Sequence, residues 1–270
     1  MKIMPVITFI CHVSLACAIV IPERAMSDAP VFDSGDQQIA LIELFSSEGC
    51  SSCPPAEKWL ANLSAHPQLF RRFVPVEYHV DYWNQLGWVD PFSNQGFSLR
   101  QRAYAYKWKR PAVYTPGFVV SGKEHRASLY QPFPDLKSLV GSKQKSPFRI
   151  RVFHEDGLGY RATVTGPRLR AQANNLLVEA ALLGNGMVSK VVSGENQGRQ
   201  LFHNFVVLNL ETKRLESEGA NFQARFRLSS PGKVHPKDYA VAFWIRDART
   251  FQVLQAVAGT LKAQKKDSSI

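Results

Sequence analysis

Residues 39–55, IALIELFSSEGCSSCPP, contain an apolar run that leads directly into two cysteines, Cys50 and Cys53. The run predicts a buried strand, and apolar residues at helical spacing after the cysteines predict a helix over about residues 53–64. The cysteine pair therefore lies where a strand leads into a helix N-terminus. Free backbone N–H groups and the helix dipole lower a thiol pKa at such a position, and the thiolate is the form that attacks disulfides or binds soft metals.

The N-terminal segment has the pattern of an export signal. Residues 3–21 are apolar and nearly uncharged, with Lys2 before them and Glu23 after them. We expect a cleaved signal peptide over residues 1–25, because small residues in this segment offer cleavage positions, and hence a periplasmic or secreted protein. The alternative is a membrane anchor that leaves the protein facing the periplasm, since the run approaches the ~20 residues that span a bilayer.

Export changes the cysteine count. The chain has four cysteines, of which Cys11 and Cys17 lie in the predicted signal. Cys50 and Cys53 are then the only cysteines of the mature protein, and we expect them to form a disulfide with each other or with a partner. Compartments outside the cytoplasm are oxidising, so disulfide chemistry is common there.

The chain is basic, with a formal net charge of +11 at pH 7. Its lysines and arginines are scattered and form no long basic block, so we do not predict that the protein binds nucleic acid. A basic surface of this kind would be attracted to an anionic membrane, which makes association with a membrane surface a further expectation.

Two regions follow the predicted signal. Residues 36–142 have an α/β pattern. The expected strands of this region are 39–45, 73–80 and 118–120, and the expected helices are 53–64, 99–109 and 135–140. Residues 147–262 change to a period of two, with about seven or eight short strands between turn signals, which predicts an antiparallel β-sandwich domain. Residues 263–270 form a polar tail.

A lone C-x-x-C pair serves redox sites, zinc sites or haem attachment. Haem attachment requires a histidine directly after the second cysteine, and this chain has Pro54 there. A four-ligand zinc site normally uses a second C-x-x-C or a nearby pair of histidines, and the sequence has neither next to the pair. The strand and helix around the cysteines, together with Thr115-Pro116 before a short strand downstream, are more specific than the pair itself.

On these features, residues 37–141 resemble the thioredoxin-like superfamily. The expected fold class is therefore a thioredoxin-like α/β domain followed by the antiparallel β-sandwich domain. The resemblance implies a cis peptide bond before Pro116, which lies against the cysteine pair in that fold. It also implies that Cys50 is the exposed attacking sulfur and that Cys53 is the buried resolving sulfur.

Several strings are similar to a bacterial family of secreted thioredoxin-like proteins whose function is unassigned. The strings are ELFSSEGCSSCPP (43–55), YHVDYWNQLGWVDPFS (78–93), RQRAYA (100–105), YTPGFVVSG (114–122) and SGENQGRQLFHNFVV (193–207). The similarity covers nearly the whole mature chain. It supports the expected fold and compartment, and it implies no substrate.

Glu43 is the acid on the strand before the cysteines. A carboxyl group buried in an apolar strand has a raised pKa, so Glu43 is a candidate acceptor for the proton of the resolving thiol. The alternative is that Glu43 lies at a strand edge or bonds to the backbone.

His79, Asp81 and Trp83 follow the second expected strand, and together with Thr115 they are candidates for a substrate groove beside the thiols. In this interpretation His79 or Asp81 assists proton transfer. In the alternative, Trp83 caps the core and Asp81 holds a turn. A further set either forms a patch against the thiol region or satisfies the backbone of turns: Glu195, Asn196, His203 and Asn204.

The sequence favours an enzyme, a thiol–disulfide oxidoreductase that acts outside the cytoplasm and needs no organic cofactor. Cys50 would attack a disulfide, and Cys53 would resolve the mixed disulfide, so the expected partners are protein thiols and disulfides or a redox partner protein. One alternative is copper handling, with Cys50, Cys53 and His79 as a soft metal site. The other is a non-catalytic binding module with the disulfide as a staple, although so short a loop stabilises a fold little.

Overall fold

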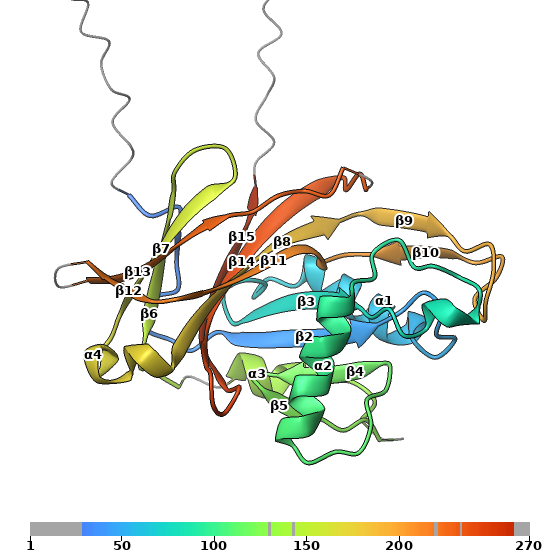
Figure 1. Cartoon of the computed structure of the whole chain (residues 1–270), viewed down its shortest axis with the longest axis horizontal. Helices are drawn as coiled ribbons and strands as arrows, with labels where there is room; N and C mark the ends of the chain where they lie inside the picture. Colours follow the sequence, from blue (N-terminus) through green and yellow to red (C-terminus); the bar gives the residue numbers. More distant parts are fainter. Residues whose placement is uncertain (1–28, 129–130, 142–143, 219–220, 233, 262–270) are drawn as a thin grey trace, which may run out of the picture.

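A computed structural model of the chain describes residues 29–128, 131–141, 144–218, 221–232 and 234–261 (Figure 1). The predicted signal peptide over residues 1–25 and the predicted polar tail over residues 263–270 lie outside these ranges. Within the described ranges, no helix is both long and apolar enough to span a membrane.

The structure is mostly β: of the described residues, 42% lie in strands and 18% in helices. The largest sheet has eight strands in the order β15 (Val253–Leu261), β14 (Asp238–Asp247), β8 (Leu176–Asn185), β11 (Val206–Arg214), β3 (Phe73–His79), β2 (Ala40–Ser46), β4 (Gly117–Val120) and β5 (Lys123–His125). The second sheet has five strands in the order β1 (Phe32–Asp33), β6 (Arg149–His154), β7 (Gly159–Thr165), β13 (Asn221–Arg227) and β12 (Glu216–Glu218). The third sheet pairs β9 (Met187–Lys190) with β10 (Gln200–His203).

The helices are short and connect these strands. They are α1 (Pro54–Asn62), α2 (Gln95–Lys107), α3 (Leu136–Gly141) and α4 (Leu169–Gln172), with 3₁₀ turns η1 (Leu63–Ala65), η2 (Asn84–Leu86) and η3 (Ala173–Asn175). α2 begins earlier than the predicted residue 99. The reason is that the side chain of Asn94 accepts a 2.7 Å hydrogen bond from the Gly96 amide and caps the helix there.

The predicted fold class, a thioredoxin-like α/β domain followed by an antiparallel β-sandwich domain, is wrong. β3 of the first region pairs in parallel with β11 of the second, and the Glu77 amide donates a 2.8 Å hydrogen bond to the carbonyl of Phe205. Strands from both regions therefore form one eight-stranded sheet, and no thioredoxin-like α/β fold is evident in the described residues. Sequence periodicity locates single strands, but it does not show which strand edges pair across the chain.

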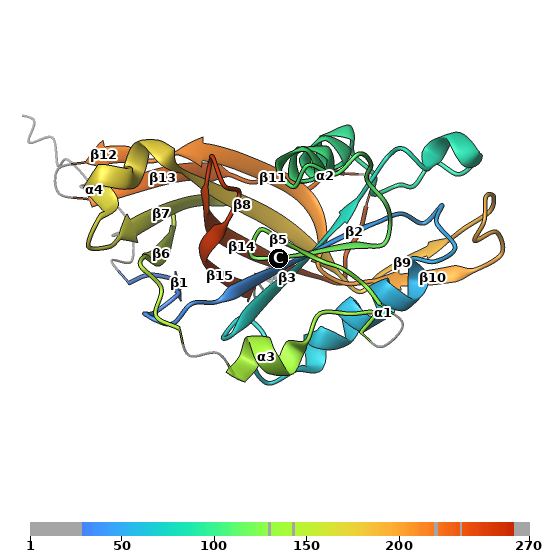
Figure 2. The ribbon, with the colours of Figure 1, turned by 90° about the horizontal axis from the view of Figure 1, so that it is seen from below.

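The two faces of β2 carry different cores. Ile42 and Leu44 pack against Leu60 of α1, and residues of α3 cover the same side. Phe45 points to the other face, where its ring contacts Tyr104 of α2. Figure 2 shows α1 and α3 on one side of β2 and β3, and α2 on the other. Because side chains alternate along a strand, every residue of β2 belongs to one of these two sides.

The five-stranded sheet packs against the half of the large sheet formed by β8, β14 and β15. The core between the two sheets includes Ile150, Val152, Ala162, Val164, Val178, Leu182, Phe243 and Val257. In Figure 1 this double layer lies at the left and α1 lies at the right. The cysteines, which precede α1, are therefore at the opposite end of the molecule from this core.

Candidate functional site

Three segments meet at the end of β2 that carries the cysteines (Figure 2). They are residues 47–53, the loop 80–94 and the loop 191–199. The Ser51 amide donates a 2.9 Å hydrogen bond to Glu195. The side-chain amide of Asn196 donates to the carbonyls of Glu48 and Cys50, at 2.8 and 2.9 Å. Glu195 and Asn196, for which a patch against the thiol region was one of two interpretations, thus contact the backbone of the cysteine segment directly.

Cys50 and Cys53 are free thiols, and their sulfurs lie 2.7 Å apart. This separation exceeds the ~2.05 Å of a disulfide bond, so the two sulfurs are close but not bonded in the structure. Cys53 is the N-cap residue of α1. The Thr115-Pro116 peptide bond is cis, as predicted, and the Thr115 carbonyl oxygen lies 3.8 Å from the Cys50 sulfur. The proline turn therefore lies beside the cysteine pair.

The two thiols differ in acidity. The hydrogen bond from the Cys53 thiol lowers the pKa of Cys50 to about 6, and the Ser52 hydroxyl, 3.2 Å from the Cys50 sulfur, contributes in the same direction. Burial raises the pKa of Cys53 well above its ordinary value, and the neighbouring Cys50 raises it further. At neutral pH Cys50 is the thiolate and Cys53 the thiol, which is the order needed for attack by Cys50 and resolution by Cys53.

Cys50 was expected to be exposed, and the structure buries it. The residue is 1% exposed and Cys53 is 0% exposed, whereas Ser51 and Ser52 between them face solvent. The surroundings are crowded, because a Cβ added at Gly49 would lie only 3.1 Å from the Cβ of Trp83. Loop 191–199 is also hydrogen bonded to the cysteine segment, as described above. This cover comes from distant parts of the chain, so the sequence next to the cysteines does not reveal it.

Two of the predicted groove residues lie together beside the thiols, since Trp83 Nε1 donates a 2.8 Å hydrogen bond to the Thr115 hydroxyl. Asp81 instead accepts a hydrogen bond from the Ser98 hydroxyl of α2, which agrees with the alternative that it holds a turn. His79 is fully buried, and its Nδ1 lies 2.7 Å from Asp90. Of the four candidates, the structure therefore brings Trp83 and Thr115 to the cysteines.

Glu43 is fully buried in a different cluster. Arg100 and the Tyr104 hydroxyl donate hydrogen bonds of 2.9 and 2.7 Å to its carboxylate. Burial raises the pKa of Glu43, and the charge of Arg100 opposes this rise. Alternation along β2 places Glu43 on the α2 face, whereas Ser46 contacts Glu57 of α1. The structure therefore does not bring Glu43 to the resolving thiol.

A second buried cluster lies between α1, β3 and β10, on the α1 face of the sheet. Its acids and imidazoles, each at most 3% exposed, are Glu48, Glu57, Glu77, His79, Asp90 and His203. His203 Nε2 lies 3.0 Å from Glu48. Burial works against a charged His79, but the carboxylate of Asp90 holds its pKa well above the ordinary value. Each imidazole thus has its own carboxylate partner.

Ser46 connects this cluster to the cysteines. Its hydroxyl donates a 2.5 Å hydrogen bond to Glu57, and a hydrogen bond between Ser46 and Cys53 lowers the thiol pKa against the larger effect of burial. Burial, together with the charge of Glu77, raises the pKa of Glu57 to about 7. The acid beside the resolving thiol therefore comes from α1, and β3 contributes Glu77 next to that acid.

Our sequence analysis missed Glu57 and Glu77. Glu57 lies four residues after Cys53, a spacing that places two side chains on the same face of a helix. Glu77 and His79 alternate in the otherwise apolar stretch FVPVEYHV, so they share one face of a strand. Both signals were present in the sequence, but the partner His203 comes from the far end of the chain.

Residues 41–246 match the family model described as "Protein of unknown function (DUF1223)". The chain belongs to this family. The match includes both cysteines, the cis-proline turn and every residue of the buried cluster, so the family spans the whole candidate site. A comparison with curated proteins found no match.

Two solved structures resemble this DUF1223 protein. One is a crystal structure of an Agrobacterium tumefaciens protein, which has 20% sequence identity, covers 87% of this chain and 99% of its own, and has a TM-score of 0.56. The other is HBP35 of Porphyromonas gingivalis, which has 16% identity, covers 87% of this chain and 79% of its own, and has a TM-score of 0.59. Identities this low show a similar fold and transfer no function.

The copper ligands expected from the sequence do not form a group. In the described part of this family member, the His, Cys, Asp and Glu side chains that could share a metal ion are Glu77, His79 and His203, with ligand atoms within 4.8 Å of one another. His79 therefore groups with Glu77 and His203 rather than with Cys50 and Cys53.

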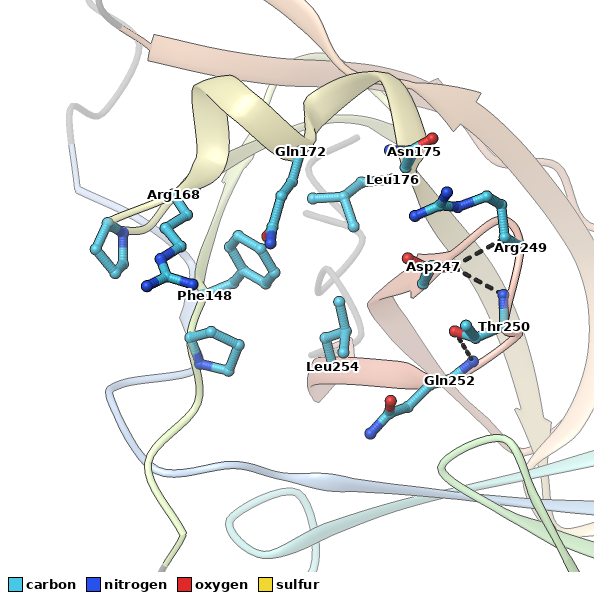
Figure 3. A pocket seen from close by; sticks show the side chains of 12 residues that line it. Phe148, Arg168, Gln172, Asn175, Leu176, Asp247, Arg249, Thr250, Gln252 and Leu254 are labelled. Carbon is cyan, nitrogen blue, oxygen red and sulfur yellow. Dashed lines mark hydrogen bonds between the residues drawn. The ribbon is translucent and has the colours of Figure 1, made fainter.

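A cavity of about 460 Å³ lies in the other half of the molecule (Figure 3). Its lining includes Phe148, Arg168 and Asp247. The acid in this cavity is already paired, because Asp247 accepts hydrogen bonds from the amides of Arg249 and Thr250, at 2.9 and 2.8 Å. The lining shows no arrangement for proton transfer or nucleophilic attack, so the dithiol end remains the candidate site.

Proposed function

We propose that this protein is a thiol–disulfide oxidoreductase that works outside the cytoplasm, with Cys50 as the attacking sulfur and Cys53 as the resolving sulfur. One observation carries the proposal: two free sulfurs lie 2.7 Å apart, and their pKa values are shifted in opposite directions. The resemblance of the cysteine segment and the Thr115-Pro116 turn to thioredoxin-like proteins supports the same chemistry. The extracytoplasmic location rests on the N-terminal sequence.

The reaction passes two electrons from the dithiol to a disulfide of a partner protein. The Cys50 thiolate attacks one partner sulfur, which forms a mixed disulfide and releases the other partner sulfur as a thiolate. Cys53 then loses its proton and attacks the Cys50 sulfur, which releases the second partner thiol and leaves Cys50 bonded to Cys53. Run in reverse, the same steps donate a disulfide to the partner.

A partner can reach Cys50 only if the cover opens, because the residue is 1% exposed. Asn196 makes two hydrogen bonds from loop 191–199 to the cysteine segment, more than any other residue of this loop. Two hydrogen bonds of about 1 kcal/mol each would lower the population of the open form by at least roughly tenfold. We expect Asn196→Ala to speed the reaction of Cys50 with an aromatic disulfide reagent by about that factor. The exposed strand residue Asn221 provides a control, Asn221→Ala, that should leave the rate unchanged.

The decisive experiment is a trapping assay in a bacterium that exports the full chain. In the Cys53→Ser variant the mixed disulfide cannot be resolved, so covalent complexes should accumulate through Cys50. The double variant Cys50→Ser/Cys53→Ser is the control and should form none. Absence of complexes, combined with no disulfide reductase or oxidase activity above the double variant, would refute the proposal.

A further inference from the structure

We propose that Glu77, His79 and His203, with Glu57 as a fourth ligand, bind one divalent cation, for which Zn²⁺ is the best match. The site lies in the interior between α1, β3 and β10, on the α1 face of the sheet. It uses no cysteine as a ligand, so metal binding can be measured in a protein that lacks the dithiol.

Unpaired polar atoms point to a missing partner at this place. Both carboxylate oxygens of Glu77, Nε2 of His79 and Nδ1 of His203 are buried and have no hydrogen-bond partner in the described structure. A buried polar atom without a partner is costly, and native proteins leave few of them. Here three side chains leave such atoms in one small volume, with all the ligand atoms within 4.8 Å of one another.

Asp90 and Glu48 each take one ring nitrogen of an imidazole, and a bound cation would displace the proton from the other nitrogen of each ring. Asp90 lies 2.7 Å from Nδ1 of His79, and Glu48 lies 3.0 Å from Nε2 of His203. When a carboxylate accepts the N–H of a neutral imidazole, the other ring nitrogen carries the lone pair. Metal-binding histidines in proteins are usually oriented by this kind of carboxylate contact.

The spacing of the ligand atoms fits a small ion. His79 Nε2 lies 3.5 Å from Glu77 Oε1, and His203 Nδ1 lies 3.9 Å from the same oxygen and 3.7 Å from Glu57 Oε2. Tetrahedral ligands about 2.1 Å from Zn²⁺ lie roughly 3.4 Å apart, so each of these three separations is within about half an ångström of that value. The same separations are too long for good hydrogen bonds between these atoms.

The charge and the donor types select the ion. Four buried acids surround two imidazoles: Glu48, Glu57, Glu77 and Asp90. A divalent cation would offset part of this buried negative charge. Imidazole and carboxylate donors together suit Zn²⁺, whereas sulfur ligands select Cu(I). Because the site is closed to solvent and its ligands come from α1, β3 and β10, we expect the ion to hold the two parts of the chain together rather than to meet a substrate.

The test uses the untagged double variant Cys50→Ser/Cys53→Ser, so that thiols cannot bind the metal. After removal of metal with a chelator, we expect it to take up one Zn²⁺ per chain and to give the visible absorption of tetrahedral Co²⁺ when Co²⁺ replaces Zn²⁺. Adding His203→Ala should lower the affinity by at least about 100-fold, since loss of even an outer hydrogen-bond partner costs about 10–100-fold. Adding His154→Ala, at an exposed histidine, should change nothing.

Three results would overturn the proposal: no Zn²⁺ uptake by the folded double variant, Zn²⁺ uptake by the wild-type protein alone, or equal uptake by the His203→Ala and His154→Ala proteins. If His203→Ala does not fold, the uptake and the Co²⁺ spectrum of the double variant still decide the question. Loss of disulfide activity in this variant is expected in either case, so the metal test stands apart from the proposed function.

Discussion

The two buried charge clusters of this protein lie on opposite faces of the same sheet and differ in how completely their atoms are paired. On the α2 face, Arg100 and Arg246 meet Glu43 and Glu179, so positive and negative groups are equal in number. On the α1 face, four acids surround two imidazoles, and atoms of three side chains remain without hydrogen bonds. In the first cluster, each of these carboxylate and guanidinium groups has an oppositely charged partner. The unpaired atoms of the second cluster would need a bound ligand as their partner. This difference separates a structural network from a candidate ligand site.

Pairing on the α2 face is dense around Glu179. Arg100 donates to its two oxygens at 2.9 and 3.1 Å, and Trp244 Nε1 donates at 2.5 Å. The guanidinium of Arg100 also lies over aromatic rings, 5.3 Å from the centroid of Tyr78. These contacts join α2 to strands of both halves of the chain, so they stabilise the sheet that merges the two sequence regions.

The largest effect should come from breaking the complete cluster. Arg100→Ala leaves Glu43 and Glu179 buried without their main partner, so we expect a loss of about 3–5 kcal/mol in the free energy of unfolding. Urea unfolding measures this loss. Arg227→Ala, which removes a solvent-exposed pair with Asp156, is the control and should change little. A loss below about 1 kcal/mol for Arg100→Ala would mean that the cluster is not structural.

Acid should weaken the same cluster. Burial opposes the charge on Glu179, but Arg100 and Arg246 lower its pKa to about 2. A group with a lowered pKa stabilises the fold above its unfolded pKa, and that contribution is lost as the pH falls through the folded pKa. The stability difference between the wild type and Glu179→Gln should therefore be full above about pH 4.5 and should shrink as the pH approaches 2. A difference that stays constant over this range would contradict the lowered pKa.

Matched substitutions on the two faces should sharpen the contrast. In metal-free protein, Glu43→Gln disturbs hydrogen bonds from Arg100 and Tyr104, so we expect a clear loss of stability, of about 1–3 kcal/mol. Glu77→Gln removes a charge that has no hydrogen-bond partner and that lies among other acids, so we expect less than about 1 kcal/mol of loss. Unfolding curves of the two variants measure both. Equal losses would show that the α1 face is as complete as the α2 face.

The smallest effect concerns acidity at the α1 face rather than stability. The hydrogen bond from the Cys53 thiol is the largest cause of the low pKa of Cys50. Cys53→Ala removes this donor, so the pKa of Cys50 should rise from about 6 toward that of an ordinary thiol. The ultraviolet absorbance of the thiolate, followed against pH, measures the change without requiring a reagent to enter the site. Ser52→Ala removes a weaker donor and should give a smaller rise; the reverse order would contradict the assignment.

Much of the thiol site follows from short stretches of sequence. The apolar run before Cys50 forms β2, the residues after Cys53 form α1, and the bond before Pro116 is cis as predicted. Each of these features depends on neighbouring residues, because strand and helix periods and turn residues act over a few positions. The role of Glu43 was harder to infer, since one step along a strand moves a side chain to the opposite face.

The sequence by itself therefore determined the local elements and the place of the thiols at a helix N-terminus. The tertiary structure decided three other things: the joining of both regions into one sheet through β3 and β11, the burial of Cys50, and the meeting of Glu77 with His203. All three depend on contacts between residues that are far apart in the chain. Such contacts depend on which strand edges pair and which faces pack when the whole chain folds. Local periodicity in the sequence does not specify these long-range pairings.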